Sequence, residues 1–323
     1  MVPKTTQHGD SRTLHGGAVP GAPGVPAYSL TTYHPSPIPV LLAVPHAGRA
    51  YPPSLVERMR QPDVTTLRLE DRYVDKLAER ICAATGAALL VAQAPRAMID
   101  LNRAPDDVDW EMFANGAPRE LGSYEPGRRV RSGLGLIPRR LPGFGELWKR
   151  RHERSDLADR IEHIHEPYHA CLSGSLADLK ARWGAALLID LHSMPPLPRN
   201  GGQFPPDFVL GDRFGAACNG SLVASTFAHF AGIGRTIAHN RPYSGGYVLE
   251  RHAQPNLRIS AMQIEIDRTR YLDARMAEPG DGFATTVHLL TDLVRRLAAE
   301  VAELGRLATN DSGGPDIWAQ AAE

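Results

Sequence analysis

Short, mainly apolar stretches that alternate with helical patterns place the strongest constraint on the fold of this chain. The predicted strands are Ile38–Val44, Ala87–Ala92, Ala97–Leu101, Ala185–Leu191, Phe208–Gly211 and Ile259–Asp267. Between them, apolar residues recur at helical spacing over Arg68–Thr85, Leu147–Trp183, Phe214–Phe230 and Phe283–Leu307. Strands that are apolar on both faces and alternate with helices are typical of a mostly parallel sheet covered on both sides. We therefore predict an α/β fold with a mostly parallel central sheet flanked by helices.

No internal repeat or linker divides the chain, so we expect a single domain over residues 31–308. Residues 1–30 are rich in Gly, Pro, Ser and Thr without periodicity, and we expect them to be disordered or loosely packed. Residues 309–323 are expected to form a similarly loose tail. Residues 104–145 hold many Pro, Gly and Arg residues and are predicted to form a long loop or lid.

Charge and composition exclude several classes of partner. The 36 Lys and Arg residues balance 36 Asp and Glu residues, so no net field favours nucleic acid or an anionic membrane. No apolar run approaches the ~20 residues of a spanning helix, and the N-terminus lacks the apolar core of a secretory signal. The widely spaced Cys82, Cys171 and Cys218 fit buried thiols in a reducing compartment. We expect a cytoplasmic protein with a small-molecule substrate, either a monomer or a homodimer.

Two of the predicted strands lead directly into a histidine. His46 follows the first strand, and His192 follows AALLIDL, with Asp190 two residues before it. Open parallel sheets bind ligands beyond the carboxyl ends of their strands, so the two imidazoles could meet at one edge. One such histidine alone is more often a hydrogen-bonded structural residue, whereas two histidines near acidic residues favour a metal site.

The segment LEDRYVDKL offers an acidic partner. Glu70 and Asp71 are predicted at the start of a helix, with Asp75 one turn later on the same face. As an alternative to metal binding, acidic residues in the first turn of a helix can simply stabilise it through the helix dipole. Two histidines and one carboxylate are, however, a common catalytic zinc set that leaves a position for water.

The strand MQIEIDR contains a candidate catalytic base. Alternation along the strand places Gln263, Glu265 and Asp267 on one face. Burial of a glutamate is costly unless it is paired or functional, and a salt-bridged Glu on an edge strand is the alternative. A carboxylate beside a metal-activated water is the general base that amide hydrolysis requires.

Two Asn-Arg pairs suggest a substrate that carries carboxylates. They occur in PRAMIDLNRAP and HNRPYSGGY, and the second precedes glycines that allow close backbone approach. Arginine binds carboxylates in a bidentate manner, although either pair alone is compatible with solvated surface residues. The predicted substrate-binding residues are Arg96, Asn102, Arg103, Asn240, Arg241, Gly245 and Gly246.

Eight motifs, taken in order, resemble the N-formylglutamate amidohydrolase family. They are VPHAGRAYP, LEDRYVDKL, MIDLNRAP, EPYHACL, LIDLHSMP, DFVLGDRFG, NRPYSGGY and QIEIDR, which together cover roughly His46 to Asp273. The resemblance implies a zinc-carboxypeptidase/phosphorylase-hydrolase-like fold with one Zn²⁺ per chain. It also implies His46, His192 and Asp71 as metal ligands, with Glu70 as the alternative acid.

The resemblance further implies catalytic roles for Glu265, as general acid and base, and for Arg103, as an anchor for substrate carboxylates. Asp190 and His169 are candidates for orienting other site residues, and a position on a helix surface is the alternative for His169. One departure concerns the acid: zinc carboxypeptidases take two ligands from one HxxE unit, whereas AGR follows His46.

The implied reaction is metal-dependent hydrolysis of N-formyl-L-glutamate, or of a related N-formyl amino acid, to formate and the amino acid. A zinc amidase or peptidase that acts on another N-acyl or peptidic substrate is an alternative. A non-catalytic binding protein with this fold is a further alternative, and the presence of His46, His192 and Glu265 argues against it.

Overall fold

An eight-stranded mixed sheet forms the centre of the protein in the computed structural model, which describes residues 10–119, 125–141, 143–199 and 204–311. The sheet order is β1-β2-β4-β3-β7-β10-β8-β9. The strands are β1 (Asp10–Gly16), β2 (Tyr28–His34), β3 (Val40–Val44), β4 (Ala88–Ala92), β7 (Ala186–Met194), β8 (Phe208–Gly211), β9 (Ile237–His239) and β10 (Ile259–Asp267). A separate pair consists of β5 (Arg140–Leu141) and β6 (Gly145–Glu146).

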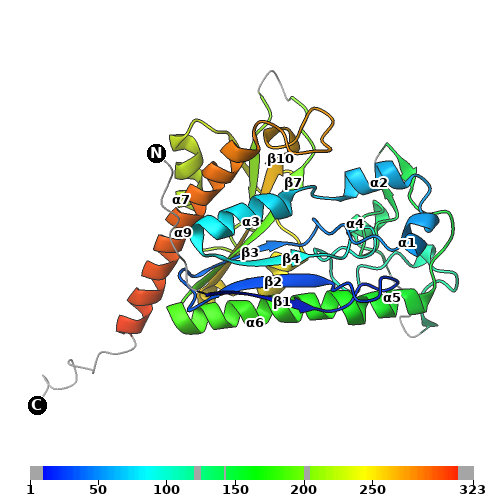
Figure 1. The fold of residues 1–323 in the computed structure, drawn as a ribbon, viewed down its shortest axis with the longest axis horizontal. Coiled ribbons are helices and arrows are strands. Elements are labelled where there is room, and N and C mark those ends of the chain that lie inside the picture. Colours follow the sequence, from blue (N-terminus) through cyan, green and yellow to red (C-terminus); the bar gives the residue numbers. More distant parts are fainter. Residues whose placement is uncertain (1–9, 120–124, 142, 200–203, 312–323) are drawn as a thin grey trace, which may run out of the picture.

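The helices cover both faces of the sheet (Figure 1). They are α1 (Pro53–Arg58), α2 (Pro62–Leu69), α3 (Val74–Thr85), α4 (Arg128–Arg131), α5 (Arg154–Arg160), α6 (Glu166–Trp183), α7 (Gly220–Gly232), α8 (Tyr247–His252) and α9 (Phe283–Asp311). In Figure 1, α3 and α9 lie on one face of the sheet and α6 runs along the other. Among the described residues, no helix has the length and apolar character needed to cross a membrane.

Strand β3 shows why the central strands read as apolar runs. Val40, Leu42 and Val44 pack in the core that includes α3, α7 and α9, whereas Leu41 and Ala43 pack in the core that includes α6. Both faces are therefore buried, which requires apolar side chains at every position. The predicted α/β fold with a mostly parallel central sheet in a single domain is confirmed.

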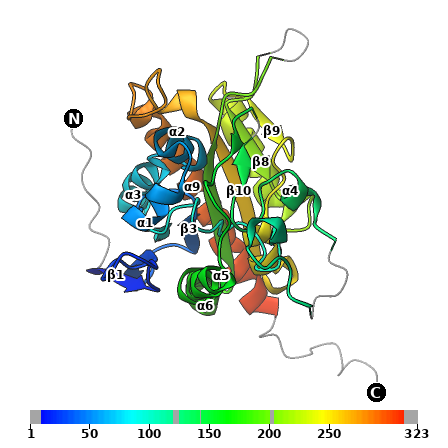
Figure 2. The same ribbon diagram turned by 90° about the vertical axis from the view of Figure 1, so that its right-hand side faces the viewer.

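The four central strands β4, β3, β7 and β10 are parallel to one another. Their carboxyl ends therefore meet at the same edge of the sheet, where side chains from different strands can converge on a ligand. Strand β8 is antiparallel to β10, and β9 is parallel to β8. Figure 2 views the molecule after a 90° turn and shows β8, β9 and β10 on one side of it.

The N-terminal region differs from the sequence prediction. Residues 10–30, which we expected to be loosely packed, include β1 and the start of β2, and β2 pairs with β4. The side chains of β1 are largely exposed, so this edge hairpin carries little of the apolar pattern that reveals a strand. Residues 1–9 lie outside the described residues. At the other end, α9 continues to Asp311, so the loose tail predicted from residue 309 is wrong for 309–311, and 312–323 lie outside the described part.

Further predictions are wrong in detail, and the helices expected to begin at Leu147 and Phe214 begin at Arg154 and Gly220. The helix expected over Arg68–Thr85 is interrupted, because α2 ends at Leu69 and α3 begins at Val74, with Tyr73 in the left-handed region at φ 60°. The segment Ala97–Leu101 forms turns rather than a strand. The apolar residues of this segment pack into the core. The helix break and this turn both place polar residues at the edge of the sheet.

Helix α6 begins after an unusual turn. A π-helical turn over Ile161–His165 connects α5 to α6, and Pro167 lies in the first turn of α6. Proline lacks a backbone N–H, so it is best tolerated in the first turn of a helix. The turn places His165 and His169 on the buried side of the helix.

Candidate active site

The structure brings the two predicted histidines together. His46 lies two residues beyond the end of β3, and His192 lies within the neighbouring parallel strand β7. Their Nδ1 atoms are 3.1 Å apart, and the two side chains are only 3% and 2% exposed. Two imidazoles with facing nitrogens at the carboxyl ends of adjacent strands form the centre of the site.

Asp71 completes this group. It lies in the break between α2 and α3, and its Oδ2 atom is 3.0 Å from His192 Nδ1 and 3.4 Å from His46 Nδ1. Its Oδ1 atom accepts a hydrogen bond from Ser193 Oγ at 3.3 Å, and Arg268 lies 3.5 Å from it. Although burial alone would raise the pKa of Asp71, its hydrogen bonds with the two histidines hold that pKa well below the usual value. Asp71 is therefore a carboxylate with one oxygen directed at the histidines.

Glu70, the alternative acid, does not join the group. Its carboxylate accepts a hydrogen bond from Arg72 Nη1 at 3.0 Å. The ligand atoms of His46, Asp71 and His192 all lie within 4.8 Å of one another, and these three are the residues that could hold a metal ion in the described part of the chain.

Each histidine is held in orientation by a carboxylate on its far side. Asp100 Oδ1 lies 2.7 Å from His46 Nε2, and Asp190 Oδ2 lies 2.8 Å from His192 Nε2. An ionised carboxylate can only accept, so each Nε2 donates a hydrogen bond to its carboxylate, which leaves each Nδ1 facing the other ring and Asp71 Oδ2. Histidines that bind metals usually donate their other N–H in this way. The donor set and its orientation therefore fit a metal ion.

Asp100 was not predicted from the sequence. It lies in MIDLN, which resembles LIDLH around Asp190. The repeated IDL pattern could have indicated that both aspartates orient a histidine.

Asp190→Asn is expected to lower the affinity for the metal by about 10–100-fold, because His192 loses the carboxylate that fixes its tautomer. Competition with a chromophoric chelator would measure this. A matched control is Asp75→Asn, which changes a buried carboxylate that pairs with Arg49 at 2.6 Å. Unchanged metal affinity in Asp190→Asn, or an equal loss in the control, would contradict the assignment.

Glu265 is located beside the histidines. It lies opposite His192 in the pairing of β10 with β7 and is 7% exposed. Because β10 lies between β7 and β8, the alternative of a surface ion pair on an edge strand is wrong. Burial raises the pKa of Glu265 to about 7, although the nearby His192 opposes this. A carboxylate with this pKa can both accept and return a proton near neutral pH.

A chain of hydrogen bonds fixes the carboxylate of Glu265. Gln263 Nε2 donates to Glu265 Oε1 at 2.8 Å, and Asn102 Nδ2 donates to Gln263 Oε1 at 3.2 Å. The backbone N–H of Val248, at the start of α8, donates to Asn102 Oδ1 at 3.0 Å. A Cβ atom on Gly246 would lie 2.4 Å from Asn102 Oδ1, so only glycine leaves room for this contact. Gly245 is at φ +100°, where side chains are strained.

The predicted arginines differ in their surroundings. Arg96 Nε donates to Asp100 Oδ2 at 2.9 Å, and the negative charges of Asp71 and Glu265 also act on Arg96. Arg103 is buried and donates to the backbone carbonyls of Leu134 and Asn102, at 2.9 and 2.7 Å. Nε and Nη1 of Arg103 therefore stabilise the fold, because both already donate to backbone carbonyls rather than to a ligand.

The second Asn-Arg pair has a structural and an exposed member. Asn240, at φ 59°, donates to Asp212 Oδ1 at 2.7 Å and accepts from the Asp212 backbone N–H at 3.0 Å. It therefore stabilises the turn after β8. Arg241 is exposed and directly precedes the loop that contains Gly245 and Gly246.

His169 is buried rather than on a helix surface. Its Nε2 lies 3.0 Å from Leu101 O, and its Nδ1 lies 2.9 Å from His252 Nε2. The neighbouring His165 makes a parallel contact, with Nε2 at 2.9 Å from Arg103 O. These histidines support the backbone on either side of Asn102 and do not touch the His46–Asp71–His192 group.

Two residues near the site were not among the predicted site residues. Arg268 donates to Ser193 Oγ at 3.2 Å and to the backbone carbonyl of Glu70, which ties β10 to β7 and to the segment carrying Asp71. Tyr243 is partly buried, and its pKa is raised by burial and by the charge of Glu265. Arg268 ends the motif QIEIDR, so its position in the sequence was a usable signal; Tyr243 offered none beyond its place in YSGGY.

The fold and the site together define a class of protein. Two oriented histidines and an aspartate near the carboxyl ends of parallel strands could hold a metal ion beside a buried glutamate, an arrangement that suits a hydrolase.

Comparisons with known proteins agree with this class. The model of the N-formylglutamate amidohydrolase family matches residues 38–272, so the chain belongs to that family. It is 30% identical over 275 residues to an N-formylglutamate deformylase of Pseudomonas aeruginosa, a match that covers 81% of this chain and 93% of the relative. It is also 30% identical over 255 residues to an N-formylglutamate deformylase of Pseudomonas putida, covering 75% and 85% of the two chains.

Solved structures show the same relationship. The crystal structure of an N-formylglutamate amidohydrolase from Ralstonia eutropha JMP134 superposes with a TM-score of 0.77 at 31% identity, covering 86% of this chain and 99% of the other. A protein of Agrobacterium tumefaciens shares the fold with a TM-score of 0.64 at 17% identity, covering 85% and 96% of the two chains. The family resemblance noted from the eight motifs is thus confirmed.

Proposed function

We propose that this protein is a zinc-dependent amidohydrolase that converts N-formyl-L-glutamate and water to formate and L-glutamate. The observation that carries the proposal is the buried convergence of His46, Asp71 and His192 beside Glu265, in a chain that belongs to the N-formylglutamate amidohydrolase family. The non-catalytic alternative is disfavoured because every group that hydrolysis needs is present and oriented. The cytoplasmic location, and the choice between monomer and homodimer, stay predictions.

The metal would be held by His46 Nδ1, His192 Nδ1 and Asp71 Oδ2. Zinc bound at such a set polarises a carbonyl and lowers the pKa of water toward ~7. Asp100 and Asp190 keep the two imidazoles in the tautomer that the metal requires. Ser193 and Arg268 hold the other oxygen of Asp71 and so fix which oxygen faces the histidines.

Glu265 performs the proton transfers. Its carboxylate accepts a proton from the attacking water as the new C–O bond forms at the formyl carbon. It then returns the proton to the nitrogen of glutamate as the C–N bond breaks, which leaves the free amine and formic acid, and the acid ionises to formate by releasing its proton to solvent. Gln263 keeps one carboxylate oxygen in place during both transfers, since it donates to Oε1.

Arg96 and Arg241 are the better placed of the predicted arginines to bind substrate carboxylates. The negative charges of Asp71 and Glu265 act on Arg96, and the Arg96 side chain is 19% exposed. Arg241 is exposed, and none of the described acidic residues forms an ion pair with it. Arg103, by contrast, positions the segment that carries Asn102.

The proposal is tested by measuring formate release from purified protein before metal removal, after removal with a chelator, and after addition of Zn²⁺. N-formyl-L-glutamate should be hydrolysed only by the metal-loaded protein. N-formyl-L-glutamine is a matched substrate that lacks the γ-carboxylate, and N-acetyl-L-glutamate tests the acyl group. Absence of formate release after zinc addition would exclude the proposal. Faster cleavage of the acetyl compound would favour a different N-acyl substrate.

A further inference from the structure

Residues 100–102 connect the two halves of the candidate active site. Asp100 contacts His46, and Asn102 is the first member of the hydrogen-bond chain that reaches Glu265. The backbone N–H of Asn102 also donates to Asp100 Oδ1 at 2.9 Å. The segment forms turns and irregular backbone, so groups outside the sheet must hold its carbonyls in place.

Two buried histidines hold the carbonyls on either side of Asn102. His165 Nε2 lies 2.9 Å from Arg103 O, and His169 Nε2 lies 3.0 Å from Leu101 O. A carbonyl oxygen can only accept, so both Nε2 atoms carry a proton and donate it. Both histidines are 0% exposed, and burial lowers the pKa of each. The two neutral rings therefore clamp the backbone that presents the Asn102 side chain.

A third histidine fixes the ring of His169. Because the proton of the neutral His169 ring is on Nε2, its Nδ1 accepts a hydrogen bond from His252 Nε2 at 2.9 Å. His252 Nδ1 in turn accepts from Ser173 Oγ at 3.1 Å. Burial lowers the pKa of His252 to about 3, so this ring is neutral as well. All ring nitrogens of His169 and His252 are thus paired, and the donors run in one direction from Ser173 to Leu101 O.

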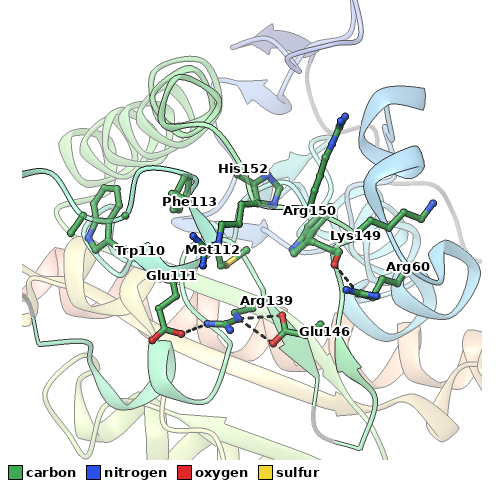
Figure 3. A pocket seen from close by; sticks show the side chains of 14 residues that line it. Arg60, Trp110, Glu111, Met112, Phe113, Arg139, Glu146, Lys149, Arg150 and His152 are labelled. Atoms are coloured by element: carbon green, nitrogen blue, oxygen red, sulfur yellow. Dashed lines mark hydrogen bonds and ion pairs between the residues drawn. The ribbon is translucent and has the colours of Figure 1, made fainter.

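A buried arginine of the same helical stretch makes a further contact. Arg160, the last residue of α5, is 4% exposed, and its Nη1 donates to Met98 O at 2.9 Å. Its Nη2 lies 3.5 Å from Nδ1 of His152, which lines the cavity of about 780 Å³ drawn in Figure 3. In the described part of the chain, that cavity shares no lining residue with His165 or His169. Variants of these two histidines should therefore leave the wall of the cavity intact.

We propose that His165 and His169 are positioning residues for the proton transfers at Glu265. By holding the carbonyls before and after Asn102, they fix the Asn102 side chain and, through Gln263, the carboxylate of Glu265. The inference rests on the proposed hydrolytic function of the site. It extends the working parts of the enzyme to the start of α6, whose residues do not touch the substrate.

Replacement of His169 by glutamine or asparagine gives a matched pair of variants. Glutamine places its amide nitrogen near the position of Nε2 and can still donate to Leu101 O, whereas the shorter asparagine reaches only the position of Nδ1. His169→Asn is expected to lower kcat for N-formyl-L-glutamate by about 10–100-fold with little change in KM, because the base is misplaced in the transition state. His169→Gln should stay within about threefold of the unchanged protein. The same order is expected for His165→Asn and His165→Gln.

Zinc content and the thermal midpoint, measured on the same samples, separate positioning from loss of metal or of fold. Zinc should be retained, because Asp100, which orients His46, has an anchor of its own: its backbone N–H donates to Leu136 O at 2.7 Å. His229→Asn is the matched control, since His229 Nε2 on α7 lies 3.1 Å from the backbone carbonyl of Leu289 on α9. The control should lower the thermal midpoint and leave kcat unchanged.

The effect of His169→Asn should depend on Glu265. In the Glu265→Gln background, His169→Asn is expected to lower the residual rate little further, because the group that it positions is already lost. A purely structural role would give effects that multiply in the double variant. Independent effects of this kind would overturn the inference.

The backbone N–H of Val248 reports on Asn102 without any substrate. It lies in the first turn of α8 and donates to Asn102 Oδ1, so its protection depends on that side chain. Hydrogen exchange at this N–H, followed by ¹H–¹⁵N spectra of the full chain, should quicken by about tenfold in the two asparagine variants. It should stay unchanged in the glutamine variants and in His229→Asn.

The two readouts distinguish failure of this inference from failure of the proposed function. If the unchanged protein released no formate, the proposed function would fail, and exchange at Val248 would still decide whether the histidines position Asn102. In an active protein, equal kcat in the asparagine and glutamine variants of both histidines would overturn the inference. Unchanged exchange at Val248 in both asparagine variants would overturn it as well.

Discussion

Glu265→Gln is expected to retain zinc and to lose about 10²–10⁴-fold in kcat/KM for N-formyl-L-glutamate. The substitution keeps the size of the side chain and an oxygen that can accept from Gln263, but it removes the group that takes the proton. Formate release and zinc content, measured on the same samples, separate loss of catalysis from loss of metal. Glu250→Gln is the matched control, because Glu250 is an exposed carboxylate that pairs with Arg213 at 2.9 Å. Equal turnover in Glu265→Gln would remove Glu265 from the mechanism.

The pH dependence gives a second readout for the same residue. Glu265 must be ionised to accept a proton, and burial raises its pKa to about 7 in the protein without metal. A bound cation favours the ionised form and lowers this pKa. We therefore expect kcat/KM to rise with pH through an acidic limb at or below about pH 7 and to level off above it. The residual activity of Glu265→Gln should lack this limb.

The two neighbouring acids Glu70 and Asp71 should respond very differently to loss of charge. Asp71→Asn is expected to weaken zinc binding by more than about 100-fold. Loss of a metal ligand should lower the affinity more than loss of a residue, such as Asp190, that only orients a ligand. Glu70→Gln should change zinc affinity little, because its carboxylate pairs with Arg72 and lies outside the group. Chelator competition measures both constants. The opposite order would show that Glu70 is the acid that joins the histidines.

The central strands were predictable because their environment leaves a simple pattern. Strand β10 spans Ile259–Asp267, the same residues that the apolar alternation indicated, and β3 and β7 differ only at their ends. Burial on both faces selects apolar residues at every position, and the pattern therefore survives without knowledge of the tertiary structure. The hairpin of β1 and β2 was missed because β1 is an exposed edge strand and most side chains of β2 are only partly buried, so neither strand is under such selection.

The site was predictable where it depends on the ends of strands and less so elsewhere. His46, His192 and Glu265 follow from their places in apolar runs. The position of Asp71 depends on a helix break in which Tyr73, not glycine, adopts positive φ, and no residue pattern indicates such a break. Likewise, nothing local distinguishes an arginine that binds a carboxylate from one that, like Arg103, donates to backbone carbonyls.

The contact between Asn102 and Gly246 has a consequence for attempts to redesign this enzyme. Residues 241–247 are the natural place to vary in search of new substrates, yet the same loop leads into Val248, whose N–H holds Asn102. A change that moves the backbone there would displace Asn102 and, through Gln263, the carboxylate of Glu265. The hydrolysis of every substrate would then be slowed. Libraries that hold Gly246 and Asn102 constant and vary Arg241 and Tyr243 should therefore yield altered selectivity more often than inactive protein.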